Sequence, residues 1–376
     1  MNRPLEGEAT ARMAPKGSSS TDLLELSHDQ LETFFLSMGE ARFRADQVFR
    51  HLHARNVREL EEMTDLARPL RARLSTVAHV GGLTLLDVLV DPDTTRKLIL
   101  RTSDGHIIEA VLIPMEVGET LCVSSQIGCD FGCAFCLTGR TRRVRDLTMG
   151  EIVDQVAHAR RLSPESKGHK APGNIVFMGM GEPLQNYDAV VGALRVLQHP
   201  LGADFSSRRI TVSTAGLVPG IRRLTEEPDL VVNLAVSLNA TTDEQRRRIM
   251  PIAKAYPMDV LLEALRAFKI PQRRRLTVEY VMLAGVNDAP ADARRLVRAL
   301  HGLRAKVNLL PHNPWPGSPF RRPEEATVQA FQSALQARGM TATVRQSRGR
   351  TIGAACGLLT PPKDAGMIYG EGMSND

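Results

Sequence analysis

Three cysteines stand close together in one short stretch of this 376-residue chain: Cys129, Cys133 and Cys136. The spacing Cys-x3-Cys-x2-Cys places three soft thiolate donors in one loop, which glycines and an aspartate make polar and flexible. Thiolates suit iron–sulfur clusters, whereas a structural zinc site usually takes four protein ligands, and a fourth is missing locally. A four-iron cluster held by three cysteines leaves one iron open to a substrate or cofactor.

The other two cysteines, Cys122 and Cys356, stand apart from this motif. The N-terminus has no basic patch followed by an apolar stretch, so we expect no signal peptide, and no run of 18 apolar residues predicts a membrane span. An odd number of cysteines without a secretion signal favours reduced thiols over a disulfide framework. We therefore expect a cytoplasmic protein with no membrane partner.

The motif lies within a region where short apolar strands alternate with helical segments. Strands are predicted at 120–124, 174–178, 209–213, 231–237, 276–282 and 305–310, with 341–344 as a further candidate, and helices near 148–161, 188–198, 217–225, 258–269, 288–300 and 324–338. This alternation predicts an α/β fold with a parallel sheet covered by helices. Six units are fewer than the eight of a full barrel, so we predict a partial (β/α)6 TIM-like barrel, with its chemistry at the carboxyl ends of the strands.

The pattern changes along the chain and predicts five segments. Residues 1–22 are rich in Ser, Gly and Pro and predict a disordered tail, 23–80 a small helical accessory domain, and 81–118 a β-rich connection to the barrel. The barrel is expected over 119–347. Residues 348–376 form a C-terminal segment that carries Cys356 and ends in a second disordered tail.

The charge is moderately basic. The formal net charge is +6, and arginine outnumbers lysine by 40 to 8, with clusters at 208–209, 246–248 and 273–275. A positive excess of this size permits a polyanionic partner such as RNA without requiring one, because arginine clusters also occur on solvated helix faces.

The stretch Cys-x3-Cys-Ala-Phe-Cys resembles the signature of radical S-adenosylmethionine (SAM) enzymes. A second stretch, Gly-Met-Gly-Glu-Pro at 179–183, resembles the motif by which that superfamily engages the ammonium group of SAM. The resemblance implies one [4Fe-4S] cluster on Cys129, Cys133 and Cys136, whose open iron binds SAM. It also implies that Gly181 and Glu182 contact SAM.

Longer stretches make the resemblance more specific. Over about 24–360 the chain is similar to the RlmN/Cfr family of RNA adenine methyltransferases, on the segments 39–47, 120–129, 174–184, 279–288, 306–314 and 354–357. The fold implied is the radical SAM partial barrel with a small N-terminal helical domain. Further SAM contacts are implied for Ser213, Ser237, Leu238, Asn239 and Asn313.

The resemblance also assigns roles to the two separate cysteines. One SAM methylates the residue matching Cys356, and a second SAM, cleaved at the cluster, yields a 5′-deoxyadenosyl radical that activates this methyl group. The carbon adds to adenine, and Cys122 releases the protein–RNA crosslink by forming a disulfide with Cys356. Glu109 matches the family's proposed proton acceptor. The implied redox partners are a flavodoxin-like electron donor and a thiol reductant.

Three residues depart from the pattern of the family. Asn239 stands where histidine is expected, and Thr351 and Leu358 flank Cys356 where aspartate and glutamine are expected. Asparagine still donates and accepts hydrogen bonds, so SAM binding is expected to survive. The two changes near Cys356 bear on the choice of target atom and RNA.

The resemblance therefore implies methylation of adenine C2 in 23S rRNA near the peptidyl transferase centre and in tRNA just 3′ of the anticodon, by a monomer. One alternative is methylation of C8, the antibiotic-resistance branch of the family. A more distant one is a non-catalytic RNA-binding protein with a structural zinc site.

Overall fold

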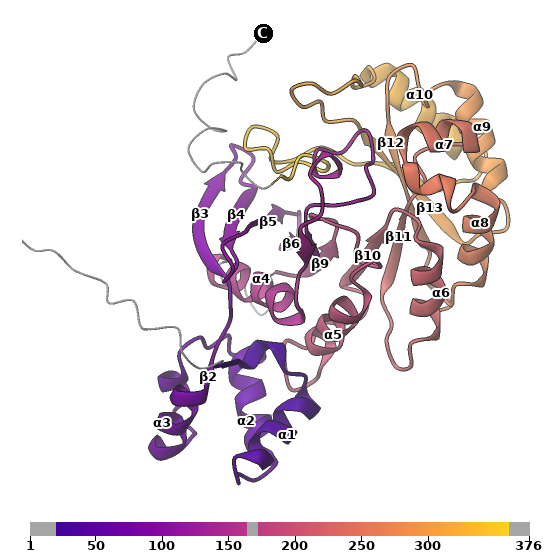
Figure 1. Cartoon of the computed structure of the whole chain (residues 1–376). Coiled ribbons are helices and arrows are strands. Elements are labelled where there is room, and N and C mark those ends of the chain that lie inside the picture. The colour runs from indigo at the N-terminus through magenta and orange to yellow at the C-terminus, as the bar shows by residue number, and fades with distance from the viewer. Residues whose placement is uncertain (1–19, 164–171, 361–376) are drawn as a thin grey trace, which may run out of the picture.

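The computed structural model describes residues 20–163 and 172–360 (Figure 1). Ten strands form one curved sheet in the order β14-β13-β12-β11-β10-β9-β6-β5-β4-β3. Seven of them are parallel: β6 (Glu119–Cys122), β9 (Asn174–Phe177), β10 (Ile210–Thr214), β11 (Asn233–Ser237), β12 (Leu276–Met282), β13 (Ala305–Pro311) and β14 (Ala342–Val344). Within the described residues β3 and β14 are the two edges, so the barrel is open.

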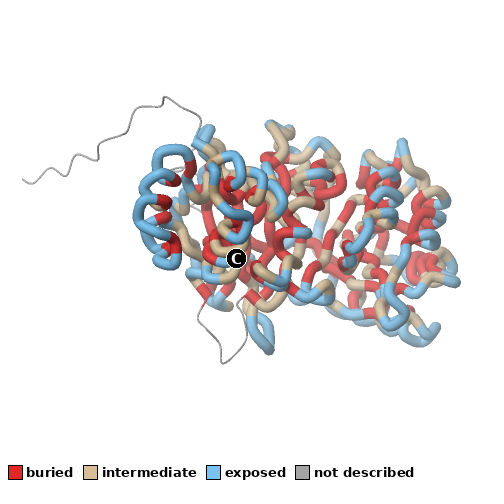
Figure 2. The backbone as a smooth tube through the Cα atoms, turned by 90° about the horizontal axis from the view of Figure 1, so that it is seen from below, coloured by how far each residue is buried: buried red, intermediate tan, exposed pale blue. Residues whose placement is uncertain are grey.

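Helices cover the outer face of the parallel strands (Figure 1). They are α4 (Met149–Leu162), α5 (Tyr187–Gln198), α6 (Val218–Glu226), α7 (Asp243–Ile249), α8 (Met258–Ala267), α9 (Pro290–Ala299) and α10 (Glu325–Gln336). Most of them bury their apolar residues against the sheet and expose residues on the opposite side, whereas α4 is buried along most of its length (Figure 2). This hydrophobic burial holds the strand ends in fixed relative positions.

The predicted fold class is confirmed. The six predicted strands of the barrel form, and the candidate at 341–344 forms β14, a seventh parallel strand at the edge. Sequence analysis missed α7, because its seven residues include three consecutive arginines and few apolar positions. None of the helices in the described part of the chain is long and apolar enough to cross a membrane.

The β-rich connection is a meander that extends the sheet on one side. It consists of β3 (Thr84–Val90), β4 (Arg96–Arg101) and β5 (Ile107–Pro114), and β5 pairs antiparallel with β6. The segment up to Thr360 returns across the top of this meander (Figure 1). The tail predicted beyond it lies outside the described residues.

The N-terminal module consists mainly of α1 (His28–Ser37), α2 (Phe43–Phe49) and α3 (Arg68–Val77), and lies below the barrel in Figure 1. Its first and last residues meet, because β1 (Thr21–Asp22) pairs with β2 (Ala78–His79). Thr21 and Asp22 are therefore ordered, and the prediction that the disordered tail extends to residue 22 is wrong at these two positions. A bridge of two residues has no periodicity that sequence analysis could detect.

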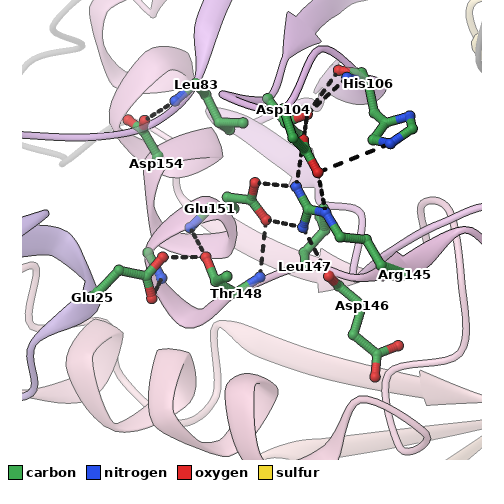
Figure 3. Close-up of polar contacts among 12 residues, drawn as sticks. Glu25, Leu83, Asp104, His106, Arg145, Asp146, Leu147, Thr148, Glu151 and Asp154 are labelled. Carbon is green, nitrogen blue, oxygen red and sulfur yellow. Dashed lines mark hydrogen bonds and ion pairs between the residues drawn. The ribbon is translucent and has the colours of Figure 1, made fainter. Parts of the chain in front are cut away.

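A polar network joins this module to the barrel (Figure 3). Arg145 lies between Asp104 of the β4–β5 turn and Glu151 of α4, with four nitrogen–oxygen distances of 2.8–2.9 Å. Thr148 caps α4 and donates its hydroxyl to Glu25 of the N-terminal module. The carboxylates raise the pKa of Arg145, so its charge is retained. The network fixes the segment that follows the cysteine motif.

Candidate active site

A cavity of about 180 Å³ opens at the carboxyl ends of the parallel strands. Its wall consists of residues at or just after the ends of β9, β10, β11 and β13, and of residues of β12 itself. This is the end of an α/β barrel at which catalytic residues are found. All five cysteines of the chain line this one cavity: Cys122, Cys129, Cys133, Cys136 and Cys356.

The cysteine motif occupies a loop closed by two short strands. After Cys122 the chain forms β7 (Gln126–Ile127), and it returns as β8 (Arg145–Asp146), which pairs antiparallel with β7. Cys129 donates its amide to Thr141 at 3.0 Å. Gly128 has φ +78°, and a Cβ there would lie 2.4 Å from the carbonyl oxygen of Arg142. Only glycine fits this approach, so the start of the loop is sterically defined.

The three thiols of this loop are desolvated. Burial raises the pKa of Cys129 to about 12, and burial also raises the pKa of Cys133 and Cys136. Without a metal they would be neutral thiols at pH 7, because a cation must replace the proton to stabilise the thiolate here. Arg246 is fully buried nearby and lowers the pKa of Cys133 by its charge.

The glycine-rich stretch after β9 forms the next part of the wall. Gly181 has φ +95°, and a Cβ there would meet Cβ of Gln126 at 2.4 Å. The Glu182 carboxylate is buried and accepts hydrogen bonds from the amides of Ala215 at 2.7 Å and Leu184 at 3.1 Å. Burial raises the pKa of Glu182 to about 7, and these bonds oppose the rise. A cationic ligand would stabilise its ionised form.

The remaining predicted SAM contacts divide into two groups. Ser213, Ser237 and Asn313 line the cavity, whereas Leu238 and Asn239 do not. Asn239 is buried with φ +56°, and its Oδ1 accepts from the amide of Val281 at 2.8 Å. This side chain therefore supports the turn after β11, and a SAM contact by Leu238 or Asn239 stays a prediction.

Cys356 reaches the cavity on the segment after β14. Cys356 is exposed, and Asn313 donates its side-chain amide to the Cys356 carbonyl at 3.2 Å. Leu137, directly after the cysteine motif, donates its amide to Gly357 at 2.8 Å. Upstream, Thr351 donates both its amide and its hydroxyl to Asp91, at 3.0 and 2.6 Å. The departure at Thr351 thus still makes a bond that holds this segment.

Cys122 and Cys356 lie close enough to influence each other electrostatically. Burial raises the pKa of Cys122 to about 12, and the nearby Cys356 thiol raises it further. Desolvation also raises the pKa of Cys356, whereas Arg345, which lines the same cavity, opposes the rise at both cysteines by its charge. All five cysteines are free, so the predicted Cys122–Cys356 disulfide is not formed in this state.

Comparison with known proteins bears on both parts of the chain. Residues 21–80 match the family described as the ribosomal RNA large subunit methyltransferase N-terminal domain, and residues 123–297 match the radical SAM superfamily. A protein named dual-specificity RNA methyltransferase RlmN from Syntrophobacter fumaroxidans is 51% identical over 88% of this chain and 95% of its own length. The protein of the same name from Geobacter sulfurreducens is 49% identical over 93% of this chain and 95% of its own length.

This chain belongs to the RlmN family. A solved structure supports the same conclusion: the radical SAM methyltransferase of Sphaerobacter thermophilus has a TM-score of 0.86 and 44% identity, covering 90% of this chain and 99% of that one. The RlmN family consists of radical SAM methyltransferases, so the alternative of a non-catalytic RNA-binding protein is wrong.

The donor set of this RlmN-family chain fits the cluster that the superfamily implies. Among the described residues, no three His, Cys, Asp or Glu side chains converge as ligands of a single metal ion. A four-iron cluster bonds each thiolate to a different iron. Three desolvated thiols beside an open cavity therefore suit a cluster with one iron left for SAM.

Glu109 lies outside the cavity, unlike Cys122 and Cys356, the other two predicted catalytic residues. It is fully buried on β5, forms an ion pair with Lys97 at 3.0 Å and accepts the amide of Thr360 at 3.0 Å. It does not line the cavity, although the pairing of Val111 with Cys122 puts Glu109 on the same face of the sheet as Cys122. Its role as a proton acceptor stays a prediction.

Sequence analysis missed residues of this RlmN-family site that act through distant contacts. Asp91 and Asp93 form the β3–β4 turn, and each accepts hydrogen bonds from the segment before Cys356. Arg246 belongs to an arginine cluster that could equally have been a solvated helix face. An Asp-Pro-Asp turn and an arginine triplet are common surface signals, and neither could be tied to the site without the three-dimensional arrangement.

Proposed function

We propose that this chain methylates C2 of adenine in 23S rRNA near the peptidyl transferase centre, and of the adenine 3′ of the anticodon in tRNA. The observation that carries the proposal is the convergence of all five cysteines on one cavity. Three of them suit a cluster, and two remain for a methyl-transfer and release cycle. The names of the relatives, dual-specificity RNA methyltransferases, support RNA as the substrate class.

Radical chemistry suits this target. The C2 carbon of adenine is electron-poor and its hydrogen is not acidic, so it does not act as the nucleophile that ordinary SAM methylation requires. When bound, a reduced [4Fe-4S] cluster would supply the electron that cleaves SAM into methionine and a 5′-deoxyadenosyl radical. We propose that Glu182, with Gly181, Ser213, Ser237 and Asn313, holds SAM in the cavity for this step.

Cys356 would carry the methyl group. Its thiol loses a proton and takes the methyl of a first SAM, which leaves as S-adenosylhomocysteine. The S-methyl group then loses a hydrogen atom to the radical from the second SAM, which leaves as 5′-deoxyadenosine, and its carbon bonds to C2. The adduct would then lose the C2 proton and one electron, for which the bound cluster would be the acceptor. The Cys356 segment is well placed for this, because Asn313 and Leu137 hold it at the edge of the cysteine motif.

Cys122 would release the product. Its thiolate attacks the sulfur of Cys356 and forms an S–S bond, while the bond between that sulfur and the carbon breaks. The carbon keeps the bonding electron pair and takes up a proton to become the methyl group, and a thiol reductant must open the resulting disulfide. Arg345 lines the same cavity, and its charge opposes the rise in pKa that burial causes at both cysteines, which would favour the thiolate needed for the attack. Glu109 is proposed to accept the C2 proton, which would require it to exchange the amide of Thr360 for substrate.

The test is anaerobic reconstitution with iron and sulfide, followed by incubation with labelled SAM, a flavodoxin-like or chemical reductant, and 23S rRNA or tRNA. Nucleosides are then read by mass spectrometry. C2-methyladenosine in both RNAs is the expected result. A C8 product would contradict the proposed target atom while retaining the chemistry. SAM cleavage without any RNA product would contradict the substrate.

A further inference from the structure

The opposite end of the barrel carries a basic groove that the proposed reaction does not use. A cavity of about 650 Å³ lies where β10, β11, β12 and β13 begin, and we define the basal groove by its five cations: Arg208, Arg273, Arg274, Arg275 and Lys306. Thr211, Asn233 and Thr277 complete its lining, so the described wall contains no carboxylate. Uncharged hydrogen-bond donors surround a concentrated positive charge.

Little in the described part of the chain offsets the charges of the basal groove, although the charge of Lys306 acts on the carboxylate of the buried Glu279. No ion pair within the described residues involves any of the five cations, although many other arginines form them. Arg274 donates to the carbonyl and hydroxyl oxygens of Ser207 at 3.1 and 2.7 Å, and Arg275 to the hydroxyl of Thr341 at 2.5 Å. The pKa of Arg274 is lowered by desolvation and by the charge of Arg208. Like charges held together in this way favour an anionic ligand.

A second hollow extends this surface along the sheet. It shares Arg273, Arg274 and Arg275 with the basal groove and continues past Arg304 to Thr341, before β14. The basic surface therefore follows the starts of the last five parallel strands. Each planar guanidinium group can bind two oxygens of one phosphate. Several such groups in an elongated row therefore match successive phosphates better than one compact anion.

We propose that the basal groove binds backbone phosphates of the folded RNA substrate, at a distance from the reacting adenine. This inference rests on the proposed function only for the identity of the RNA. The two cavities lie at opposite ends of the same strands, and a strand of seven residues such as β12 spans about 23 Å at ~3.3 Å per residue. An RNA that occupies both ends of the barrel must therefore extend beyond the loop that carries the reacting adenine.

An acidic electron donor is the other macromolecule that this charge could attract. The geometry disfavours it, because electron transfer weakens steeply with distance and the cluster cysteines lie at the far end of the barrel. A concave groove lined by hydroxyl and amide groups also suits phosphates that enter it. RNA is thus the occupant that both shape and charge favour.

The test compares a full-length tRNA transcript with its isolated anticodon stem-loop, using filter binding at several salt concentrations. The triple variant Arg208→Gln, Arg273→Gln and Lys306→Gln removes the three cations whose side chains have no described hydrogen bond or ion pair. We expect a shallower dependence of tRNA affinity on salt, by about 0.7–0.9 per lost contact in the logarithmic slope. Binding of the short stem-loop and reductive SAM cleavage should not change.

The matched control replaces three exposed arginines on outer helices, Arg222→Gln, Arg266→Gln and Arg298→Gln, with the same loss of charge. Equal effects of the two triple variants, or equal loss on both RNAs, would overturn the proposal. Two further outcomes would overturn it, both with unchanged tRNA binding. Altered binding of inorganic phosphate would indicate a small-anion site, and slower reduction by a flavodoxin would indicate a site for the electron donor. RNA binding is measured without turnover, so this test would still decide where the RNA binds if the methylation proposal failed.

Discussion

Two of the segments that bring cysteines into the cavity, the cysteine-motif loop and the segment of Cys356, are held in different ways. The cysteine-motif loop is closed by contacts among its own residues, namely the β7–β8 pair, the bond from Cys129 to Thr141 and an ion pair between Asp130 and Arg143, and its second half also bonds to Ile249 and Gly357. The Cys356 segment is held by residues far away in the sequence, including Asp91 and Thr138. A loop closed by local contacts suits a fixed cofactor, whereas in the proposed reaction the Cys356 segment would have to shift between a methyl donor and an acceptor.

The largest effect on SAM cleavage is expected from the removal of one of the three proposed cluster ligands. Cys129→Ala, Cys133→Ala or Cys136→Ala leaves two thiolates in the loop, so we expect loss of the cluster and complete loss of SAM cleavage. Iron content, visible absorbance and 5′-deoxyadenosine formation measure this. A variant that kept its iron would show that the loop does not hold the cluster.

Cys356→Ala should affect only the second segment. We expect the iron content of the natural chain and retained capacity for reductive SAM cleavage, but no methylated RNA, because no sulfur remains to carry the methyl group. The same assays, with mass spectrometry of the RNA, separate this variant from the cluster variants. Methylated adenine formed by Cys356→Ala would remove the residue from the mechanism.

Cys122→Ala should separate methyl delivery from release. The carbon can still reach adenine, but no neighbouring thiolate attacks Cys356, so we expect about one covalent protein–RNA adduct per active enzyme and no second turnover. A denaturing gel with labelled RNA detects the adduct, and the double variant with Cys356→Ala is the control. Absence of a shifted band in the single variant would contradict the release role.

The difference between the two segments also explains how far the site could be predicted from sequence. The cysteine motif and the glycine-rich turn at Gly181 are local patterns, and the structure places both on the cavity. The strands of the barrel were predictable for the same reason, because each has its own apolar run. By contrast, the contact between Asp91 and Thr351 spans 260 residues, and the side chain of Asn239 supports a turn that depends on Asn287 and Met250. Such contacts leave no local signature.

A milder change tests whether the distant contacts position Cys356. Thr351→Val removes the hydroxyl that donates to Asp91 and keeps the backbone bond, so one hydrogen bond to a buried carboxylate is lost. Bonds of this kind contribute about 1.5–3 kcal/mol, and partial exposure of Thr351 places the effect at the lower end. We expect roughly tenfold slower methyl transfer at ~1.4 kcal/mol per decade, with unchanged iron content and SAM cleavage. Thr351→Ser keeps the hydroxyl and should restore the rate. If serine failed to do so, or if valine also lowered SAM cleavage, the two segments would be coupled, and the contrast between a fixed loop and an adjustable segment would fail.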